Sequence, residues 1–336
     1  MTLRQFIKAV RWFAFGGLSR WRYLQYDDCR RAATGMHWST RIDVKGALTC
    51  AQSVVIGRRT YLRVSTGAQL ILKKGSWLGD DCEINPLRLI KIGLYSSIQN
   101  RSFILGDVTI GAGCACGANL YISSSKHHFE DPPEFPIRWQ DAHALSLKEC
   151  ATESQPVIVG DDCWIGINVV ITPGIKIGRG CVIGANSVVT KDLPPYSIAA
   201  GAPAKVLKRR LNFSPPNSLQ ANQIEHIPYF YSGFLQWREG VKNLQQAIQK
   251  EGWETEDEFS VMLAVKRGIH LRLTVKAEVE GEICHESQII AVAPGMGRVD
   301  FLACPATDGL LTFKWTPLRK HRNGSSTLVI LAVDQK

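Results

Sequence analysis

Histidines gather in one stretch of this chain. His127 and His128 are adjacent in the segment SSSKHHFEDPPEF, and His143 follows farther along the same stretch. The ordinary pKa of histidine lies close to neutral, so its neutral ring can take a proton from a hydroxyl that attacks a carbonyl carbon. The stretch is therefore a candidate for general-base chemistry. Histidines in a solvated surface loop are the alternative interpretation.

The cysteines suggest packing rather than chemistry. Ten are scattered along the chain, with no CxxC pair and no histidines at zinc-site spacing. That distribution favours reduced thiols over a disulfide framework. We expect no metal site.

The composition is that of an ordinary folded protein. Of the 336 residues, 45% are hydrophobic and 21% are charged, and the net charge is +10. Disordered and collagen-like classes are excluded. No run of about 18 apolar residues occurs, and Arg4, Lys8 and Arg11 interrupt any signal-like stretch, so we expect a cytoplasmic protein. The positive charge fits a phosphate-rich cofactor or an anionic acceptor as well as nucleic acid.

A repeat of six residues supplies the elements that could position the histidines. From Val159 the chain runs VGDDCW, IGINVV, ITPGIK, IGRGCV, IGANSV and VTKDLP. Every hexad opens with Val or Ile, and Gly takes the second place in four of them. This period fits neither an amphipathic helix nor an alternating strand. It predicts a parallel solenoid in which three hexads make one triangular coil and the first residues stack inward.

Earlier and less regular hexads extend the solenoid toward the N-terminus. They begin at Ile56, Leu78, Ile92, Ile98, Ile110 and Cys116, so we expect the coils to span about residues 45–200. The fifth place falls at crowded corners, where small side chains fit. Cysteine occupies it at Cys82, Cys114, Cys163 and Cys181. We expect these to be packing residues, with a thiol nucleophile as the alternative.

The repeat is interrupted where the histidines lie. Hexads stop after Ile122 and resume near Val157, so residues 123–156 leave the coil as a loop. Long excursions from a rigid scaffold are where solenoid proteins place function. We therefore expect the active site in this loop, which also carries Asp131, Glu134 and Trp139.

Residues 157–209 have the sequence VIVGDDCWIGINVVITPGIKIGRGCVIGANSVVTKDLPPYSIAAGAPAKVLKR. This segment resembles the last coils of the hexapeptide-repeat O-acetyltransferases, left-handed parallel β-helix enzymes that include galactoside, maltose and polysaccharide O-acetyltransferases. The resemblance covers about half of the chain. It implies acetyl-CoA as co-substrate and a homotrimer with CoA in a groove between subunits. In this family a Ser/Thr-rich turn ending in histidine supplies the base, which implies His127, with His128 as the competing position.

The resemblance also implies residues that bind CoA. They are Trp164, Ala185, Thr190, Lys191, Lys205 and Lys208. Lysines would meet the adenosine phosphates, and Lys208 stands where relatives often have Arg. Trp164 would form a wall of the groove or pack at a coil corner. The γ-class carbonic anhydrases are also β-helices and bind metal with three histidines, but theirs are spread over neighbouring coils, unlike the adjacent His127 and His128.

The two ends lie outside the resemblance. Residues 1–40 predict a basic, aromatic helical segment that would cap the first coil or contact the inner membrane face. The β-helix domain would then cover residues 41–211, and the Pro/Ser/Asn-rich residues 212–218 predict a linker. Strand-like runs in residues 219–336 predict a β-rich accessory domain, such as a sandwich, with a helix over residues 241–250.

The expected protein is mainly β and acts on a small or polymeric saccharide. The resemblance implies an O-acetyltransferase that modifies a hydroxyl of a surface polysaccharide (capsule or O-antigen) or its saccharide precursor, with no nucleic-acid partner. Transfer would be direct, in a ternary complex. The alternatives are an N-acetyltransferase of an amino sugar or antibiotic, and a non-catalytic solenoid scaffold.

Overall fold

The computed structural model describes residues 35–37, 39–146, 154–234, 253–265, 268–303, 309–318 and 328–335. The chain divides into two compact units between Asn212 and Phe213. Nearly all of the predicted basic N-terminal segment, and the helix predicted over residues 241–250, lie outside the described residues. Within the described part, no helix is long and apolar enough to cross a membrane.

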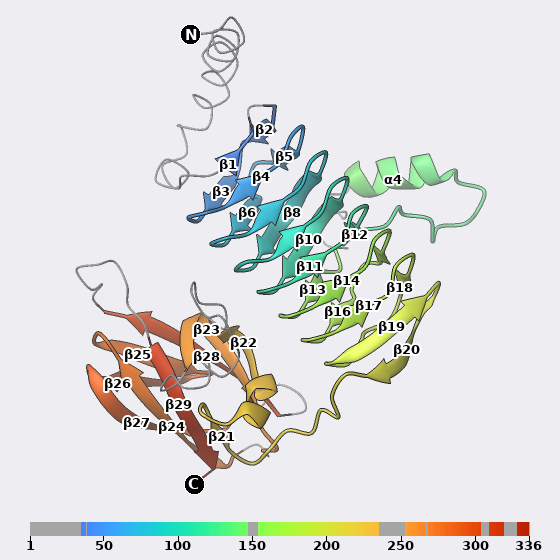
Figure 1. Ribbon diagram of the computed structural model, residues 1–336. Coiled ribbons are helices and arrows are strands. Elements are labelled where there is room, and N and C mark those ends of the chain that lie inside the picture. The colour runs from blue at the N-terminus through green and yellow to red at the C-terminus, as the bar shows by residue number, and fades with distance from the viewer. Residues whose placement is uncertain are drawn as a thin grey trace, which may run out of the picture. The chain divides into compact units, whose positions relative to one another are not determined.

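The N-terminal unit is a β-solenoid with three faces, each a ladder of parallel strands (Figure 1). The first face is formed by β1 (Gly35–Met36), β4 (Val55–Ile56), β7 (Trp77–Leu78), β9 (Ser97–Ile98), β11 (Ala115–Cys116), β14 (Trp164–Ile165), β17 (Val182–Ile183) and β19 (Ser197–Gly201). The antiparallel strand β20 (Ala204–Arg209) pairs with β19 and ends this face.

The other two faces share two long strands that bend around a corner. The second face is formed by β2 (Arg41–Val44), β5 (Tyr61–Val64), the first halves of β8 (Glu83–Ile92) and β10 (Phe103–Ile110), β12 (Tyr121–Ser123), β15 (Val170–Ile171) and β18 (Val188–Val189). The third is formed by β3 (Ala47–Cys50), β6 (Gln69–Leu72), the second halves of β8 and β10, β13 (Val157–Val159) and β16 (Lys176–Ile177).

The hexad pattern explains the core of the solenoid. Val159, Ile165, Ile171, Ile177, Ile183 and Val189, the first residues of the six regular hexads, are all 2% exposed or less. Strand register stacks each on its equivalent in the next coil, as Ile122 pairs with Ile171 and Ile171 with Val189. Burial of such aliphatic side chains stabilises the fold by about 1.5–3 kcal/mol each. The predicted β-solenoid is confirmed.

Side chains at the fifth place of a hexad donate hydrogen bonds to backbone carbonyl oxygens of the following coil. Along one corner, hydroxyl or thiol groups donate to carbonyl oxygens one coil on: Ser96 to Gly111 (2.6 Å), Cys114 to Gly160 (3.2 Å), Cys163 to Gly178 (3.3 Å) and Cys181 to Pro194 (3.1 Å). Cys82 does the same toward Gln99 at the neighbouring corner (3.3 Å), and burial raises the pKa of its thiol. All four cysteines are buried, as expected for packing residues.

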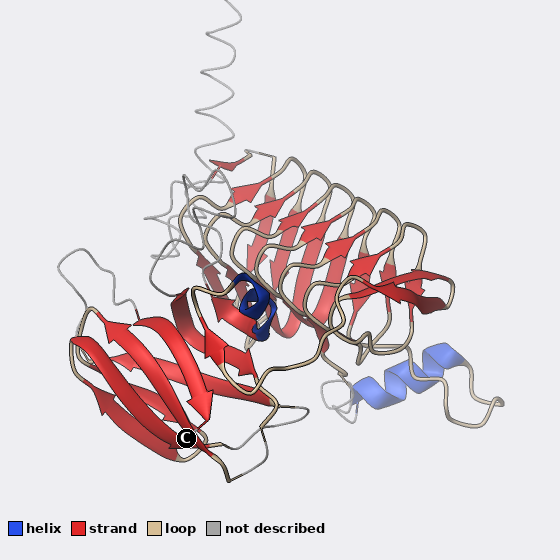
Figure 2. Cartoon of the chain, turned by 60° about the horizontal axis from the view of Figure 1, so that its bottom comes forward, coloured by secondary structure: helices blue, strands red, loops and turns tan. Residues whose placement is uncertain are grey.

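The solenoid unit differs from the prediction in two places. The first coil begins at β1, where Gly35 pairs with Val55, a few residues before the boundary expected at residue 41. The predicted loop contains a helix, α4 (Ile137–Ser146), which projects from the solenoid in Figure 2. At β1 the chain has Met36 and His37 where Ile56 and Gly57 open the next hexad of this face, so the repeat is not evident there. A short helix of low amphipathicity leaves no periodic trace either.

The C-terminal unit consists of antiparallel strands in the order β26–β25–β28–β23–β29–β24–β27. Their bounds are β23 (Trp253–Met262), β24 (His270–Ala277), β25 (Gly281–His285), β26 (Gln288–Val292), β27 (Gly295–Leu302), β28 (Leu310–Pro317) and β29 (Leu328–Gln335), with β21 (Leu219–Gln220), a 3₁₀ helix (Ile224–Tyr229) and β22 (Phe230–Phe234) at the edges. The predicted β-rich C-terminal region is confirmed.

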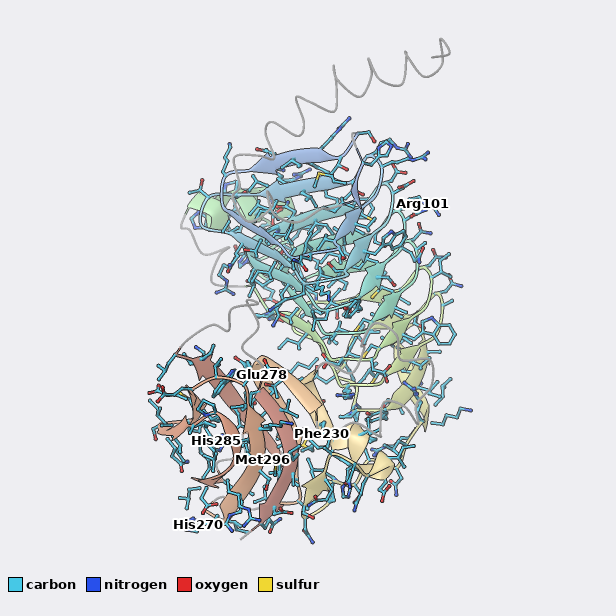
Figure 3. All side chains as sticks on the ribbon, turned by 60° about the vertical axis from the view of Figure 1, so that its left-hand side comes forward. Arg101, Phe230, His270, Glu278, His285 and Met296 are labelled. Carbon is cyan, nitrogen blue, oxygen red and sulfur yellow. The ribbon has the colours of Figure 1, made fainter. Side chains whose placement is uncertain are left out.

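Aromatic rings from strands that lie far apart in this strand order pack together in the core of the unit. Phe301 of β27 contacts Phe313 of β28 edge to face at 5.5 Å, and the ring of His285 stacks on Phe313 at 4.7 Å. His285 and Phe230 are buried (Figure 3), and so is Tyr229. The described aromatic residues at positions 229 and 230 are therefore core residues and do not form a sugar-stacking surface.

Candidate active site

The excursion from the solenoid is fastened at both ends to one point of β10. Ser124 begins the excursion and Ser154 ends it, and their hydroxyls lie 2.8 Å apart. The Ser154 hydroxyl donates to the Asp107 carboxylate (2.7 Å), and the Asp107 backbone N–H donates to the Ser124 hydroxyl (2.7 Å). The two ends are therefore held together although 30 residues separate them.

Asp107 is the centre of this network. Its side chain is 7% exposed and also accepts hydrogen bonds from the backbone N–H groups of Arg88 and Leu89 and from the Arg88 guanidinium. Burial alone would raise the pKa of Asp107, but the hydrogen bonds from Ser154, Leu89 and Arg88 outweigh it and place that pKa below its usual value. The carboxylate is thus charged at neutral pH.

Helix α4 is held to the start of the loop by Gln140. The buried Gln140 amide donates to the Phe135 carbonyl oxygen (2.7 Å) and accepts from the Asp131 backbone N–H (3.1 Å). Phe135, Trp139 and His143 stack in sequence along the helix, with ring centroids 4.6 Å and 5.2 Å apart. These contacts fix the helix turn that carries Asp141.

Asp141 binds both adjacent histidines. One carboxylate oxygen lies 2.8 Å from Nδ1 of His127, and the other accepts the backbone N–H of His128 at 2.9 Å. The hydrogen bond from His128 lowers the pKa of Asp141, burial opposes it, and the bond with His127 lowers it further. An ionised Asp141 accepts a proton-bearing Nδ1, which leaves the Nε2 lone pair of His127 available.

The two histidines differ in access. The His127 side chain is 78% exposed, whereas that of His128 is 22% exposed and its Nε2 faces the Asp131 carboxylate at 3.9 Å. A general base must reach a proton on the substrate. The geometry therefore suits His127 better than His128.

Both histidines line a cleft of about 830 Å³ on the second face of the solenoid. Its lining residues are Arg63, Ser65, Asn85, Pro86, Leu87, Leu105, Gly106, Tyr121, Ser123, Ser125, Lys126, His127, His128, Arg138, Asp141 and Ala142. Strand register places Asn85, Leu105 and Ser123 in one row across neighbouring coils. The cleft thus runs from the early coils to the start of the loop.

The residues predicted for CoA lie elsewhere on the solenoid. Trp164 of β14 belongs to the first face, as does β20 with Lys205 and Lys208. Ala185 follows β17, and Thr190 and Lys191 follow β18. All six side chains are exposed, and none lines the cleft at His127. Trp164 is 61% exposed, so it does not pack inside a coil corner.

Sequence reasoning did not identify Asp141 or Arg63. Asp141 stands 14 residues after His127 on a helix that the sequence did not predict. Among the described residues, no group of three His, Cys, Asp or Glu side chains could hold a metal ion.

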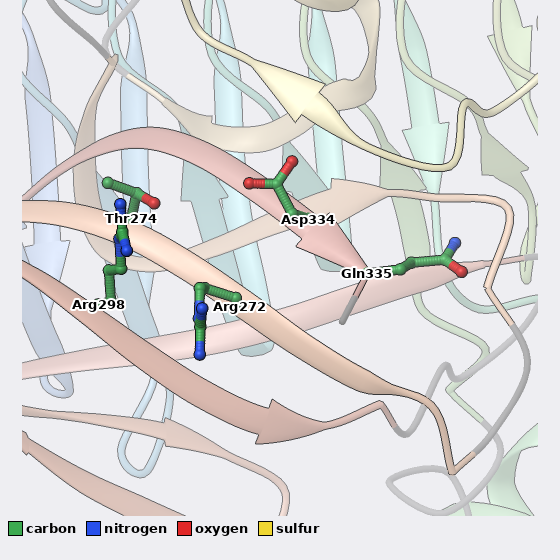
Figure 4. A pocket seen from close by; sticks show the side chains of 5 residues that line it. All are labelled: Arg272, Thr274, Arg298, Asp334 and Gln335. Atoms are coloured by element: carbon green, nitrogen blue, oxygen red, sulfur yellow. The ribbon is translucent and has the colours of Figure 1, made fainter.

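A second, smaller cleft of about 270 Å³ lies on β24, β27 and β29 of the C-terminal unit (Figure 4). Arg272, Thr274, Arg298, Asp334 and Gln335 line it. Arg272 forms two hydrogen bonds with Asp300 (2.8 Å and 3.0 Å), and the amides of Gln220 and Gln335 bond to Asp334 and to the Ala264 carbonyl. Most of its polar groups are thus already bonded within the unit.

Comparisons with known proteins agree with this architecture. Residues 156–191 match the family described as "Hexapeptide repeat of succinyl-transferase". A protein named as a probable macrolide acetyltransferase from Lysinibacillus sphaericus is 34% identical over 126 residues, which cover 35% of this chain and 69% of the relative. The chloramphenicol acetyltransferase of Klebsiella aerogenes is 37% identical over 106 residues, 30% of this chain and 50% of that protein. The chain thus spans about half the length of that relative.

Similar solved structures include a maltose O-acetyltransferase from Clostridium difficile 630, 23% identical, covering 56% of this chain and 75% of that chain with a TM-score of 0.28. A polysialic acid O-acetyltransferase is 19% identical, covering 54% and 90% with a TM-score of 0.31.

A β-solenoid of six-residue repeats, interrupted by a loop that carries a histidine–carboxylate pair, defines the class of protein. With the match to the macrolide acetyltransferase, the chain belongs to the hexapeptide-repeat acetyltransferase family. The resemblance stated from the sequence is confirmed.

Proposed function

We propose that this chain is an acetyl-CoA-dependent O-acetyltransferase that modifies a hydroxyl of a surface polysaccharide or its saccharide precursor. The proposal depends chiefly on the 2.8 Å contact between Nδ1 of His127 and the Asp141 carboxylate, at a cleft where the coils are interrupted. A histidine held in one tautomer by a carboxylate is the arrangement that general-base catalysis requires.

His127 would act directly on the acceptor. Its Nε2 takes the proton as the acceptor hydroxyl oxygen attacks the thioester carbonyl carbon, and a backbone amide stabilises the resulting oxyanion. The carbon–sulfur bond then breaks, and the CoA sulfur leaves with the proton from His127. Asp141 keeps the ring oriented and stabilises its positive charge between the two steps.

The donor site would be completed by a second copy of the chain. The six residues implied for CoA, Trp164, Ala185, Thr190, Lys191, Lys205 and Lys208, are exposed but absent from the lining of the His127 cleft. A homotrimer with CoA between neighbouring copies would bring them to the acetyl acceptor. Light scattering should then give about three times the chain mass of 37.3 kDa.

The enzyme is proposed to act in the cytoplasm. Residues 1–40 would cap the first coil or bring the protein to the inner membrane face, and neither role requires a nucleic-acid partner. Sedimentation with anionic lipid vesicles, with and without these residues, separates the two roles.

An antibiotic acceptor is the second candidate. The relatives named for chloramphenicol and for a macrolide favour it. Supplying both compounds beside a set of glycans, and identifying the product by mass spectrometry, distinguishes the acceptor class; locating the acetyl group by fragmentation of the product distinguishes O- from N-acetylation.

The His127→Ala variant tests the catalytic assignment. We expect acetyl transfer to fall by roughly 10²–10⁴-fold, the usual contribution of a general base, while acetyl-CoA still binds. His128→Ala is the matched control and should retain most of the rate. Unchanged turnover in His127→Ala would remove His127 from the mechanism. Absence of acetyl-CoA binding in the wild type would instead favour a scaffold.

A further inference from the structure

The cleft at His127 carries two arginines that form no hydrogen bond or salt bridge through their side chains with another described residue. Of its charged residues, Asp141 is bonded to His127 and His128, and Lys126 forms an ion pair with Glu130. Arg63 and Arg138 are exposed. Neither forms a side-chain hydrogen bond or salt bridge with another described residue, although the charge of Arg138 acts on Asp141.

These two arginines lie at different places along the cleft. Arg138 stands on α4 one turn before Asp141, close to the His127 pair. Arg63 lies on β5, and the ladder continues through β8 and β10 to β12, which ends at Ser123. At about 4.8 Å per strand, Arg63 lies roughly 14 Å from Ser123 along the row. A ligand whose hydroxyl reacts at His127 would therefore reach Arg63 only with a different part of the molecule.

Between the arginines the lining suits a sugar. Asn85, Ser65, Ser125 and the phenol of Tyr121 offer hydrogen-bonding groups, while Leu87 and Leu105 offer apolar surface to ring faces. Asp43 is paired with Arg63 in the ladder but forms no salt bridge with it. Guanidinium groups bind carboxylates and phosphates through paired N–H donors, more strongly than they bind neutral hydroxyls.

We propose that the acceptor is an anionic saccharide whose carboxylate or phosphate binds Arg63, with Arg138 drawing negative charge toward His127. This inference rests on the proposed function and specifies the acceptor class of the same site. The anionic group has two sources, the carboxylates of an acidic polysaccharide or the diphosphate of a nucleotide-linked sugar. Both share the chemistry that Arg63 recognises.

Binding and turnover measured on the full chain test the acceptor class. The probes are a glucuronate-containing oligosaccharide, a neutral glucose oligosaccharide of equal length, and UDP-glucose. Calorimetry with the His127→Ala variant measures binding without chemistry, and initial rates with acetyl-CoA measure transfer. We expect at least one anionic probe to bind more tightly than the neutral one. Preference for glucuronate indicates the polysaccharide source, and preference for UDP-glucose the nucleotide source.

The Arg63→Gln variant locates the contact. It should weaken binding of the preferred anionic probe by roughly 10–100-fold, because charge-assisted hydrogen bonds are lost. In the rate measurements this loss should appear mainly in KM. Binding of the neutral probe should be unchanged. Arg63→Lys should recover part of the loss. Arg58→Gln removes an exposed arginine outside the cleft and serves as the control.

Two results would overturn the inference. One is binding of the neutral probe as tight as that of both anionic probes. The other is an equal loss of binding affinity for the neutral and the anionic probes in the Arg63→Gln variant. In either case, His127-dependent acetylation of a neutral glycan would leave the proposed function standing. Acetyl transfer that does not depend on His127 would refute the proposed mechanism but not the preference for an anionic ligand.

Discussion

At the scale of single residues, Asp141 determines which histidine can act. Its carboxylate orients the ring of His127 and at the same time bonds the backbone of His128. Because its pKa lies below the usual value, with the His128 N–H as the largest cause, Asp141 is ionised throughout the neutral range. A carboxylate that stays charged can keep His127 in a single tautomer.

The Asp141→Asn variant should slow acetyl transfer by about 100-fold or more, since the amide permits the wrong tautomer of His127. The change should appear in kcat, with KM for acetyl-CoA little altered, in steady-state kinetics. Asp131→Asn is the matched control, because Asp131 lies 3.9 Å from His128. A large loss in Asp131→Asn together with a small one in Asp141→Asn would assign the base to His128 instead.

The sequence predicted part of this site. The interrupted repeat and the family resemblance pointed to the loop and to His127. They could not point to Asp141, because pairing across 14 residues depends on the position of α4. Nor could they point to Arg63, which enters the cleft from a strand several coils away.

At the scale of elements, a column of side chains fastens successive coils along one corner. Arg101, Asn119, Asn168 and Asn186 each adopt a left-handed backbone, with φ of 57–58°. The Arg101 guanidinium donates to Asn119 (2.9 Å), Asn119 to Asn168 (2.7 Å) and Asn168 to Asn186 (2.8 Å). Asparagine tolerates this conformation better than other side chains.

Two substitutions of Asn168 separate backbone strain from hydrogen bonding. Asn168→Ala should lower the free energy of unfolding by about 2 kcal/mol, since it loses the ladder bonds and strains the left-handed turn. Asn168→Gly removes only the bonds and should lose about 1 kcal/mol. Urea unfolding followed by circular dichroism measures both. Equal losses would show that the left-handed conformation contributes nothing.

The hydrogen bonds of Asp107 should hold the loop of residues 124–154 in a fixed conformation. Asp107→Ala leaves the Arg88 and Leu89 N–H groups and the Ser154 hydroxyl without their acceptor, so we expect a loss of about 2–3 kcal/mol. The control is Asp81→Asn, which removes the charge of an exposed pair with Arg59 and keeps a residue type that tolerates the left-handed backbone at this position; it should lose less than about 1 kcal/mol. Proteolysis near residues 124–154 should rise in Asp107→Ala; an unchanged cleavage rate would contradict the anchoring role.

The same network gives a pH dependence. The folded-state pKa of Asp107 lies below its unfolded value, so its stabilisation is complete above the ordinary aspartate value of 3.8 and is lost as pH falls through the lower, folded-state pKa. Unfolding measured from neutral pH downward should therefore show an acid loss in the wild type that is smaller in Asp107→Ala. Parallel acid curves for the two proteins would exclude Asp107 as a source of that loss.

The sequence predicted the strands of the regular coils better than it predicted helix α4 and the first strand, β1. Aliphatic residues at a period of six fixed which side chains point inward, because every third hexad returns to the same face. Helix α4 has no such signal, since contacts such as the Gln140 amide with the Phe135 carbonyl hold it in place. At β1, Met36 and His37 replace the Ile–Gly pair that opens the next hexad of the same face, so the repeat is not recognisable there.

At the scale of the whole molecule, the boundary between the units lies earlier than the composition suggests. Pro, Ser and Asn in residues 212–218 are typical of a linker, yet part of this segment belongs to the C-terminal unit. The Phe213 ring packs on Tyr229 at 4.9 Å and on Tyr231 at 6.2 Å, and Pro216 accepts the Ala264 backbone N–H at 2.8 Å. Composition indicates that residues 212–218 favour turns, but it cannot indicate that some of them contact residues far along the chain.

The position of this boundary can be tested with two fragments. A fragment that begins at Phe213 should be more stable by about 2–3 kcal/mol than one that begins at Leu219, because the second loses an aromatic side chain from the edge of the core and the hydrogen bond at Pro216. Chemical unfolding of both fragments measures the difference. Phe213→Ala in the full chain supplies the control, since it removes the ring and keeps the backbone, and it should reproduce most of the loss in the C-terminal transition. Equal stability of the two fragments would mean that residues 213–218 act as a linker after all.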